Sequence, residues 1–186
     1  MADYKKQGGV PMHTAIVVDD EPITRMDLSD MLREQGFSVV GEASDGFDAI
    51  ELCRSLSPDV VLMDIRMPVF DGLSASETIL SEELAGCVVL LTAFSSKELV
   101  ERANQIGVTG YLVKPVEERL LLPTIEVALA QSLRLRTMRE ENRTILRQME
   151  ESKLVERAKI IIAKEKGISE SEAYSELRQL SMNKRC

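Results

Sequence analysis

The chain has 186 residues, 44% of them hydrophobic and 29% charged, and its net charge is −8. This length accommodates one sizeable domain and a smaller appendage, and no apolar run is long enough to span a membrane, so we expect a cytoplasmic protein with no membrane partner. Three widely spaced cysteines without a C-x-x-C pair argue against a disulfide framework or a zinc site, and a single histidine, His13, argues against His-centred catalysis.

The predicted elements begin after residues 1–12, which we expect to form a disordered lead-in. Apolar strands are predicted at residues 14–18, 37–42, 60–63, 87–91 and 110–113, and helices at residues 22–35, 46–56, from residue 72 onward, and 95–106. Strand and helix alternate five times along residues 13–131. This alternation predicts an α/β domain with a doubly wound, five-stranded parallel sheet covered by helices on both faces.

The third strand ends in the most distinctive residue of the chain. Val60 to Met63 form an apolar run without alternation, which is typical of a strand covered on both faces, and Asp64 follows directly. Burying an ionised carboxylate is costly unless it is paired or binds a metal, and ligands of open α/β sheets bind at the carboxyl ends of the strands. Asp64 is therefore a candidate reactive group, although an aspartate that merely starts a turn before Pro68 is the alternative.

Four further polar residues follow strand ends, namely Asp19, Asp20, Thr92 and Lys114. Taken singly, Thr92 could bond its own backbone and Lys114 could be a solvated charge. In a parallel sheet, however, all four converge with Asp64 on one edge, and adjacent carboxylates repel one another unless a cation lies among them. Oxygen ligands with room for water suit Mg²⁺, which predicts a magnesium site.

This set of groups is suited to phosphoryl transfer, which requires mainly positioning and charge neutralisation. Asp64 would attack the phosphoryl group as the nucleophile. Lys114 and Mg²⁺ would neutralise the phosphoryl oxygens, and the Thr92 hydroxyl would donate to one of them. We do not expect an enzyme with an external product.

Residues 13–131 resemble the receiver domain of two-component response regulators, which has a flavodoxin-like fold. The matching motifs are Asp19-Asp20, Asp64, Met67-Pro68, Asp71-Gly72, Thr92-Ala93, Tyr111 and Lys114-Pro115. The resemblance implies a cognate sensor histidine kinase as partner. It also implies that Asp20, Asp64 and the main-chain carbonyl of Arg66 bind the metal directly and that Asp19 binds it through water.

The same resemblance implies a conformational switch. Thr92 and Tyr111 would reorient when Asp64 is phosphorylated, and the Lys114-Pro115 peptide bond would be cis, which costs little before proline. Arg66 and Phe94 flank the acidic site at positions that could tune the lifetime of the phosphate.

A helix much longer than a receiver needs is predicted from residue 118 to residue 166. A heptad seam runs through Ala128, Gln131, Leu135, Met138, Asn142, Ile145, Met149 and Ser152. We interpret residues 132–152 as a coiled-coil linker that forms a homodimer, because a lone Asn at a seam position fixes register and strand number. Dimerisation could depend on phosphorylation, and a single helix packed on its own receiver is the alternative.

Residues 153–186 predict a small all-α domain. Gly167 ends the long helix, and Ser169 with Glu172 forms a capping box for a second helix. Ala173, Leu177 and Leu180 are expected to pack against Ile160, Ile161 and Ala163.

The charge of the chain is unevenly distributed. Residues 1–132 hold 10 Lys and Arg against 22 Asp and Glu, whereas residues 153–186 hold 8 Lys and Arg against 5 Asp and Glu. Any polyanionic partner is therefore expected to bind this tail.

The tail resembles the ANTAR domain of the AmiR and NasR type. The matching motifs are Glu156-Arg157-Ala158-Lys159, Gly167-Ile168-Ser169-Glu170, Ala173-Tyr174, Leu177-Arg178 and Ser181-Met182 followed by basic residues. ANTAR domains usually carry a third helix after the last motif, whereas this sequence stops at Cys186. Either the sequence is shortened before a third helix, or that helix is absent, which would weaken RNA affinity and the packing of the second helix.

This resemblance implies binding to leader-RNA stem-loops and transcription antitermination. RNA loops present unstacked bases to aromatic and cationic side chains, and phosphate contacts make the affinity salt-dependent. The candidate RNA-binding residues are Lys159, Lys164, Tyr174, Arg178, Lys184 and Arg185. Tyr174 could instead belong to the helical core.

A phosphorylation-dependent RNA-binding regulator is therefore the favoured function. The alternative is a receiver that acts only through protein interaction, with the helical tail as a docking or dimerisation element. DNA binding is a weaker third possibility, because the tail lacks a convincing helix-turn-helix.

Overall fold

The computed structural model describes residues 13–93 and 97–183. The chain divides into two compact units, residues 1–135 and 136–186. Among the described residues, no helix combines the length and the apolar character that a membrane crossing requires.

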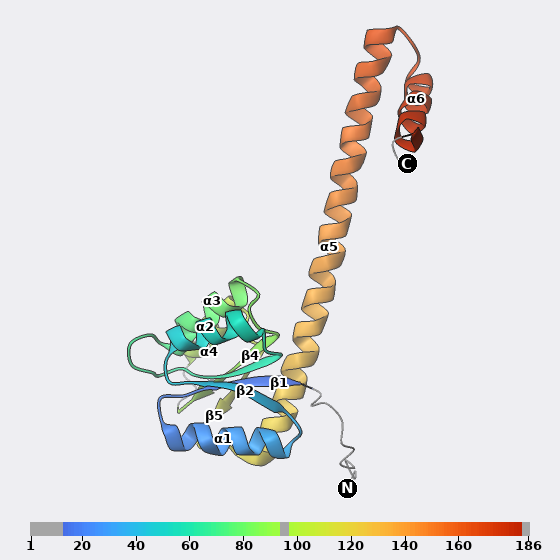
Figure 1. Cartoon of the computed structure of the whole chain (residues 1–186). Helices are drawn as coiled ribbons and strands as arrows, with labels where there is room; N and C mark the ends of the chain where they lie inside the picture. Colours follow the sequence, from blue (N-terminus) through green and yellow to red (C-terminus); the bar gives the residue numbers. More distant parts are fainter. Residues whose placement is uncertain (1–12, 94–96, 184–186) are drawn as a thin grey trace. The chain divides into compact units, whose positions relative to one another are not determined.

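The first unit is built on a parallel five-stranded sheet (Figure 1). Its strands are β1 (Thr14–Val18), β2 (Ser38–Ala43), β3 (Val60–Asp64), β4 (Cys87–Thr92) and β5 (Gly110–Val113). They lie in the order β2-β1-β3-β4-β5, and every neighbouring pair is parallel. The predicted doubly wound sheet is therefore confirmed.

Helices alternate with the strands as predicted. They are α1 (Pro22–Glu34), α2 (Gly46–Leu56), α3 (Gly72–Ser81), α4 (Lys97–Ile106) and the first part of α5 (Glu118–Lys166). Asp45 caps α2 by accepting hydrogen bonds from the main-chain N–H groups of Phe47 and Asp48. Residues 95 and 96, where the predicted fourth helix begins, lie outside the described residues.

Two hydrophobic cores fill the two faces of the sheet. Val61 and Met63 of β3 belong to the core under α2, α3 and α4, whereas Val60 and Leu62 belong to the core under α1 and the start of α5. All four side chains are fully buried. This explains why the sequence of β3 shows no alternation, since both of its faces are covered.

Helix α5 contributes to the first unit only with its first turns. Leu121, Ile125 and Ala128 are fully buried in the core of the receiver-like unit, although Pro123 lies among them. From residue 133 to residue 157, every residue of the 49-residue helix is exposed. From Leu135 to Ser152 the predicted heptad seam is thus open to solvent in the single chain, whereas its first residue, Ala128, is buried in the core of the first unit and cannot belong to the seam.

The second unit is a helical hairpin made of the end of α5 and of α6 (Glu170–Asn183) (Figure 1). Gly167 ends α5 in the left-handed conformation, with φ = +67°. The predicted capping box is confirmed, because Glu172 accepts hydrogen bonds from Ser169 N and Oγ at 2.9 and 2.7 Å and returns one to Ser169 Oγ at 3.3 Å. These contacts fix the start of α6.

The packing of this hairpin differs in part from the prediction. Ala173 is fully buried as expected, but Ile160 and Ile161 are 50% and 56% exposed. Within the hairpin, the partly buried positions of α5 are Ala158, Lys159, Ile162 and Ala163. The expectation that Ile160 and Ile161 pack against α6 is wrong, because the partly buried stripe of α5 follows Ala158, Ile162 and Ala163 and leaves Ile160 and Ile161 outside it. The side chain of Leu180 lies outside the described part.

Candidate functional site

The carboxyl ends of four strands bring the predicted site residues together. Asp19 follows β1 and is fully buried, while Asp64 ends β3 and Thr92 ends β4, each with 6% exposure. Lys114 follows β5, and its Nζ lies 2.5 Å from Asp19 Oδ2 and 2.8 Å from Asp64 Oδ2. The predicted convergence on one edge of the sheet is confirmed.

Lys114 is held beside Thr92 by the main chain. The register pairs Thr92 with Val113, and the Lys114 N–H donates to the Thr92 carbonyl oxygen at 2.8 Å. The Lys114-Pro115 peptide bond is cis, as the family resemblance implied. Tyr111 lies on β5, three residues before Lys114, and is about half exposed. The reorientation of Thr92 and Tyr111 on phosphorylation remains a prediction.

The third carboxylate completes a group that fits a divalent metal. One oxygen each from Asp19, Asp20 and Asp64 lies within 4.8 Å of the other two, and Asp20 is exposed while the others are buried. Three carboxylates and one ammonium leave a negative excess, and all the ligand atoms are oxygens. This donor set suits Mg²⁺, which binds one or two carboxylates and retains water or phosphate as its other ligands.

The surroundings of Asp64 and Lys114 shift the pKa values of both groups. Burial raises the pKa of Asp64, and the hydrogen bond and charge of Lys114 offset this only in part. Burial tends to lower the pKa of Lys114, but its hydrogen bonds to Asp19 and Asp64 outweigh that effect, so its pKa is raised. Lys114 therefore stays cationic beside a carboxylate from which water is largely excluded.

The loop after β3 adds a backbone contact to Asp64. The main-chain N–H of Arg66 points at Asp64 Oδ1 from 3.4 Å, and the Arg66 side chain is exposed. The role of the Arg66 carbonyl as a metal ligand stays a prediction. Phe94 lies outside the described residues.

Gly72 has a role that sequence reasoning missed. A Cβ atom at this position would lie 1.8 Å from the main-chain oxygen of Asp64, so only glycine lets α3 start so close to the end of β3. Asp71 caps the same helix, with Oδ1 accepting from Ser74 N at 3.0 Å and Oδ2 from Ser74 Oγ at 2.8 Å. The sequence indicated only the Asp71-Gly72 motif and a helix from residue 72 onward, because the close approach is a tertiary contact.

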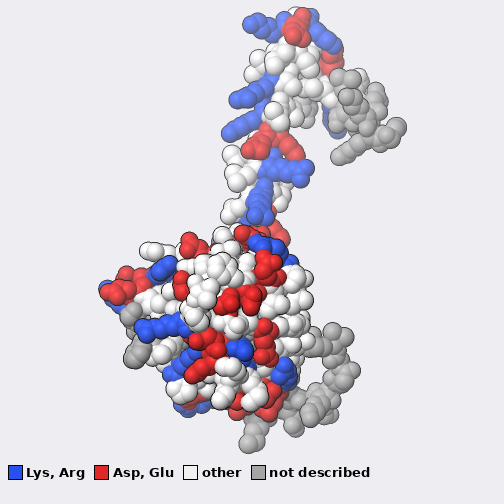
Figure 2. All heavy atoms as spheres, turned by 60° about the vertical axis from the view of Figure 1, so that its left-hand side comes forward, with Lys and Arg blue, Asp and Glu red and all other residues white. Residues whose placement is uncertain are grey.

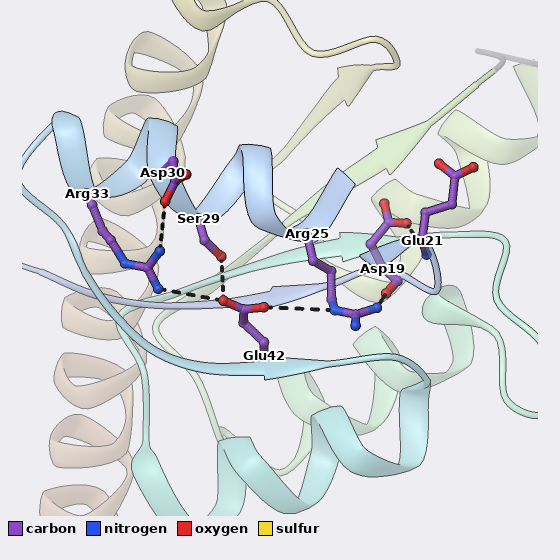
Figure 3. Close-up of polar contacts among 7 residues, drawn as sticks. All are labelled: Asp19, Glu21, Arg25, Ser29, Asp30, Arg33 and Glu42. Atoms are coloured by element: carbon purple, nitrogen blue, oxygen red, sulfur yellow. Dashed lines mark hydrogen bonds and ion pairs between the residues drawn. The ribbon is translucent and has the colours of Figure 1, made fainter. Parts of the chain in front are cut away.

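Arg25 is a second residue that sequence reasoning missed. It lies near the N-terminus of α1, and its Nη1 donates to the main-chain oxygen of Asp19 at 2.6 Å (Figure 3). A cation near a helix N-terminus opposes the helix dipole. This unfavourable placement is a sequence signal that could have drawn attention to Arg25.

The candidate RNA-binding residues lie in different surroundings. Lys164, Arg178 and Tyr174 are exposed, and Tyr174 is 51% accessible. Lys159 is less accessible than an RNA-binding residue is expected to be, because its side chain is only 18% exposed and its Nζ lies 2.9 Å from both Glu156 and Glu170. Lys184 and Arg185 lie outside the described residues.

The charge contrast between the units follows the sequence. Residues 1–135 hold 11 Lys and Arg against 22 Asp and Glu, and residues 136–186 hold 12 against 9. On the face shown in Figure 2, acidic side chains gather on the first unit and basic side chains extend from the second. Net charge therefore favours the approach of a polyanion to the second unit over the first.

Comparisons with known proteins agree with this division. The family model described as the response regulator receiver domain matches residues 15–126, and that of the ANTAR domain matches residues 143–186. The chain therefore belongs to the response regulators that combine a receiver domain with an ANTAR domain, an RNA-binding antitermination domain. The ANTAR match begins ten residues before the boundary suggested by the sequence.

Individual relatives share one or both domains. The chain is similar to the transcriptional regulatory protein PdtaR of Mycobacterium tuberculosis (strain CDC 1551 / Oshkosh), with 41% identity over 170 residues that cover 91% of this chain and 82% of that protein. The receiver resembles a LuxR-family response regulator of Aurantimonas sp. SI85-9A1 (TM-score 0.60, 30% identity, 64% of this chain and 86% of that one). It also resembles chemotaxis protein CheY4 of Vibrio cholerae (TM-score 0.59, 28% identity, 63% and 99%).

Family membership gives the site a general meaning. Receiver domains bind Mg²⁺ at an acidic pocket of the kind formed by Asp19, Asp20 and Asp64, and they have a cognate kinase as partner. ANTAR domains bind RNA.

Proposed function

We propose that the chain is phosphorylated on Asp64 in the presence of Mg²⁺ and that phosphorylation controls binding of its second unit to leader-RNA stem-loops, which promotes antitermination. The observation that carries this proposal is the convergence of Asp19, Asp20, Asp64 and Lys114 in a chain that continues into an ANTAR domain. A sensor histidine kinase is the expected phosphoryl donor.

The chemistry at Asp64 follows from its neighbours. A carboxylate oxygen of Asp64 attacks the phosphorus of the donor, the bond from phosphorus to the leaving group breaks, and the leaving group takes the electron pair. Lys114 moves its charge toward the transferred oxygens, and the Thr92 hydroxyl donates to one of them. Asp19, Asp20 and Asp64 would hold Mg²⁺, which supplies further neutralisation of phosphoryl charge.

The RNA-binding part of the proposal is supported by charge and exposure. Lys164, Arg178 and Tyr174 are exposed on a unit with a positive net charge. The cations would contact phosphates, and Tyr174 would stack on an unpaired base. Lys159 is already paired with Glu156 and Glu170, so we expect it to stabilise the hairpin more than it contacts RNA.

Dimerisation through α5 is the expected link between the two events. The seam residues Leu135, Met138, Ile145 and Met149 are each between 46% and 59% exposed. A second copy would cover these side chains, and Asn142 would favour a parallel two-stranded arrangement.

The phosphorylation step can be tested with a small donor. The full chain is incubated with acetyl phosphate and Mg²⁺, and the modified residue is found by mass spectrometry. We expect one added phosphoryl group on Asp64 in the wild-type chain and none in Asp64→Asn. Modification at another residue, or no need for Mg²⁺, would contradict the proposal.

RNA binding can be tested with a pool of hairpin RNAs with randomised loops. The selected hairpin should bind the phosphorylated chain more tightly than Asp64→Asn, and duplex DNA should not compete. Replacing Lys164 and Arg178 by Ala should weaken binding and reduce the slope of log affinity against log salt by roughly 0.7–0.9 for each lost phosphate contact. If no hairpin is selected while phosphorylation still drives dimerisation, the protein-interaction function replaces this one.

A further inference from the structure

The main chain around Asp20 is fixed on both sides by side chains (Figure 3). Arg25 Nη1 donates to the Asp19 carbonyl oxygen at 2.6 Å, and Asp19 Oδ1 accepts from the Glu21 N–H at 3.0 Å. The carbonyl belongs to the peptide group before Asp20, and the N–H belongs to the peptide group after it. Both peptide groups that determine the direction of the Asp20 side chain are therefore held.

Arg25 is itself held in place by Glu42 on β2 (Figure 3). Arg25 Nε lies 3.9 Å from Glu42 Oε2, while Glu42 Oε1 accepts from the buried Ser29 Oγ at 2.9 Å and lies 3.6 Å from Arg33 Nη2. The Arg25 side chain is only 19% exposed. A planar guanidinium with several donors can bridge a carbonyl and a carboxylate in this way, whereas a lysine ammonium lacks the fixed geometry.

We propose that Arg25 is a positioning residue of the metal site, which orients Asp20 through the Asp19–Asp20 peptide group. This inference rests on the proposed function, in which Asp20 helps to hold Mg²⁺ for phosphorylation of Asp64. Asp19 and Asp64 are buried and paired with Lys114, but Asp20 is exposed. The direction of the Asp20 carboxylate therefore depends on the backbone that Arg25 holds.

Positioning and simple electrostatics predict opposite effects of removing Arg25. A positive charge near the site repels a divalent cation, so its loss alone would tighten metal binding. Loss of a group that orients a ligand weakens metal binding, typically by 10- to 100-fold. The sign of the change therefore separates the two explanations.

The experiment compares Arg25→Met and Arg25→Lys with the matched control Arg33→Met in the full chain. Arg33 lies on the same helix and contacts Glu42 and Asp30 but not Asp19, so the control removes the same charge and spares the backbone contact. Metal affinity is measured by electron paramagnetic resonance with Mn²⁺ as the probe and Mg²⁺ as competitor. Amide hydrogen exchange at Asp20 and Glu21 is measured separately in EDTA.

We expect Arg25→Met to bind Mn²⁺ about tenfold more weakly, Arg25→Lys to be intermediate, and Arg33→Met to remain within about twofold of wild type. Exchange at Glu21 should accelerate in Arg25→Met. Unchanged or tighter binding in Arg25→Met would overturn the inference. If Arg25→Met fails to fold, Arg25→Lys decides, because its charge is retained and only positioning can weaken its metal binding.

Different results contradict the proposed function and the role of Arg25. A wild-type chain that does not bind Mn²⁺, or is not phosphorylated on Asp64, contradicts the proposed function. A wild-type chain that does both, with an Arg25→Met variant that binds metal equally well, contradicts only the role of Arg25.

Discussion

The receiver unit and the α5–α6 unit achieve order by different means. The receiver covers both faces of its sheet, and its functional carboxylates Asp19 and Asp64 are seated at the ends of fully buried strands. In the second unit, Ala173 is the one fully buried side chain among the described residues. Its order depends on a capping box, a left-handed glycine and surface ion pairs.

This difference in burial matches the different demands that a charged site and a binding surface place on the two units. A site that must align several charged groups is placed where packing leaves little freedom. A surface that must fit another macromolecule is placed where little is buried, so that a partner can complete it. Substitutions in one unit, with stability or titration as the measurement, therefore test this difference.

The largest contrast is expected from core substitutions. Leu62→Ala removes a fully buried side chain of β3 and should destabilise the receiver by about 3 kcal/mol. Ile145→Ala, at a half-exposed position of α5, should change the stability of dilute protein by less than about 0.5 kcal/mol. Urea unfolding monitored by circular dichroism measures both. Equal losses in dilute protein would show that the second unit has a core of its own.

The next largest loss of stability is expected at Gly72, where the start of α3 lies against the main chain of Asp64. Gly72→Ala places a methyl group against the Asp64 carbonyl and should cost about 2–3 kcal/mol. The control Gly107→Ala also has a glycine replaced, but at φ = +86° with nothing within 4 Å, so about 1 kcal/mol of backbone strain is expected. Thermal unfolding provides the comparison. If the control is the less stable variant, packing at the end of β3 is looser than the structure implies.

A smaller effect is expected at the cap of α3. Burial tends to raise the pKa of Asp71, but hydrogen bonds from Ser74 outweigh it and lower the pKa. Because the folded pKa is below the unfolded one, the cap stabilises the receiver above the ordinary pKa of an aspartate and is lost as the pH falls through the lowered folded value. Asp71→Ala should cost about 1 kcal/mol at neutral pH. Asp71→Asn should keep most of the cap without this pH dependence, and an unchanged acid profile in Asp71→Asn would contradict the assignment.

The smallest effect is expected at the corresponding cap of α6. Hydrogen bonds from Ser169 lower the pKa of Glu172, so the charged cap stabilises α6 above the ordinary pKa of a glutamate and is lost as the pH falls through the lowered folded value. Ser169→Ala should return the pKa of Glu172 toward its ordinary value, as measured by NMR titration. Ser171→Ala serves as the control on the same helix. A titration of Glu172 that does not respond to Ser169→Ala would mean that the capping box does not persist in solution.

Much of the receiver could be predicted from the sequence because its signals are local. An apolar strand that stops at an acid identifies Asp64, and the parallel topology then places Asp19, Thr92 and Lys114 beside it. The roles of Gly72 and Arg25 could not be predicted in the same way. Each depends on a contact with the main chain of a residue at the carboxyl end of a strand, Asp64 for Gly72 and Asp19 for Arg25.

The second unit was predicted less well for a related reason. Its capping box lies within four consecutive residues, and the sequence was sufficient to predict it. The stripe of α5 that faces inward depends on how closely α6 approaches. Small side chains such as Ala158 and Ala163 lie on this stripe and allow the approach, whereas Ile160 and Ile161 do not lie on the stripe. The ion pair of Lys159 with Glu170 depends on the same approach, so its burial could not be predicted.

The lysine bridge across the acidic pocket also bears on how the protein matures. In small zinc domains, bare ligands make folding conditional on capture of the ion. Here the Lys114 ammonium lies against both Asp19 and Asp64, so the chain carries a counter-ion of its own. We therefore expect the newly synthesised receiver to reach its native shape without waiting for a metal ion.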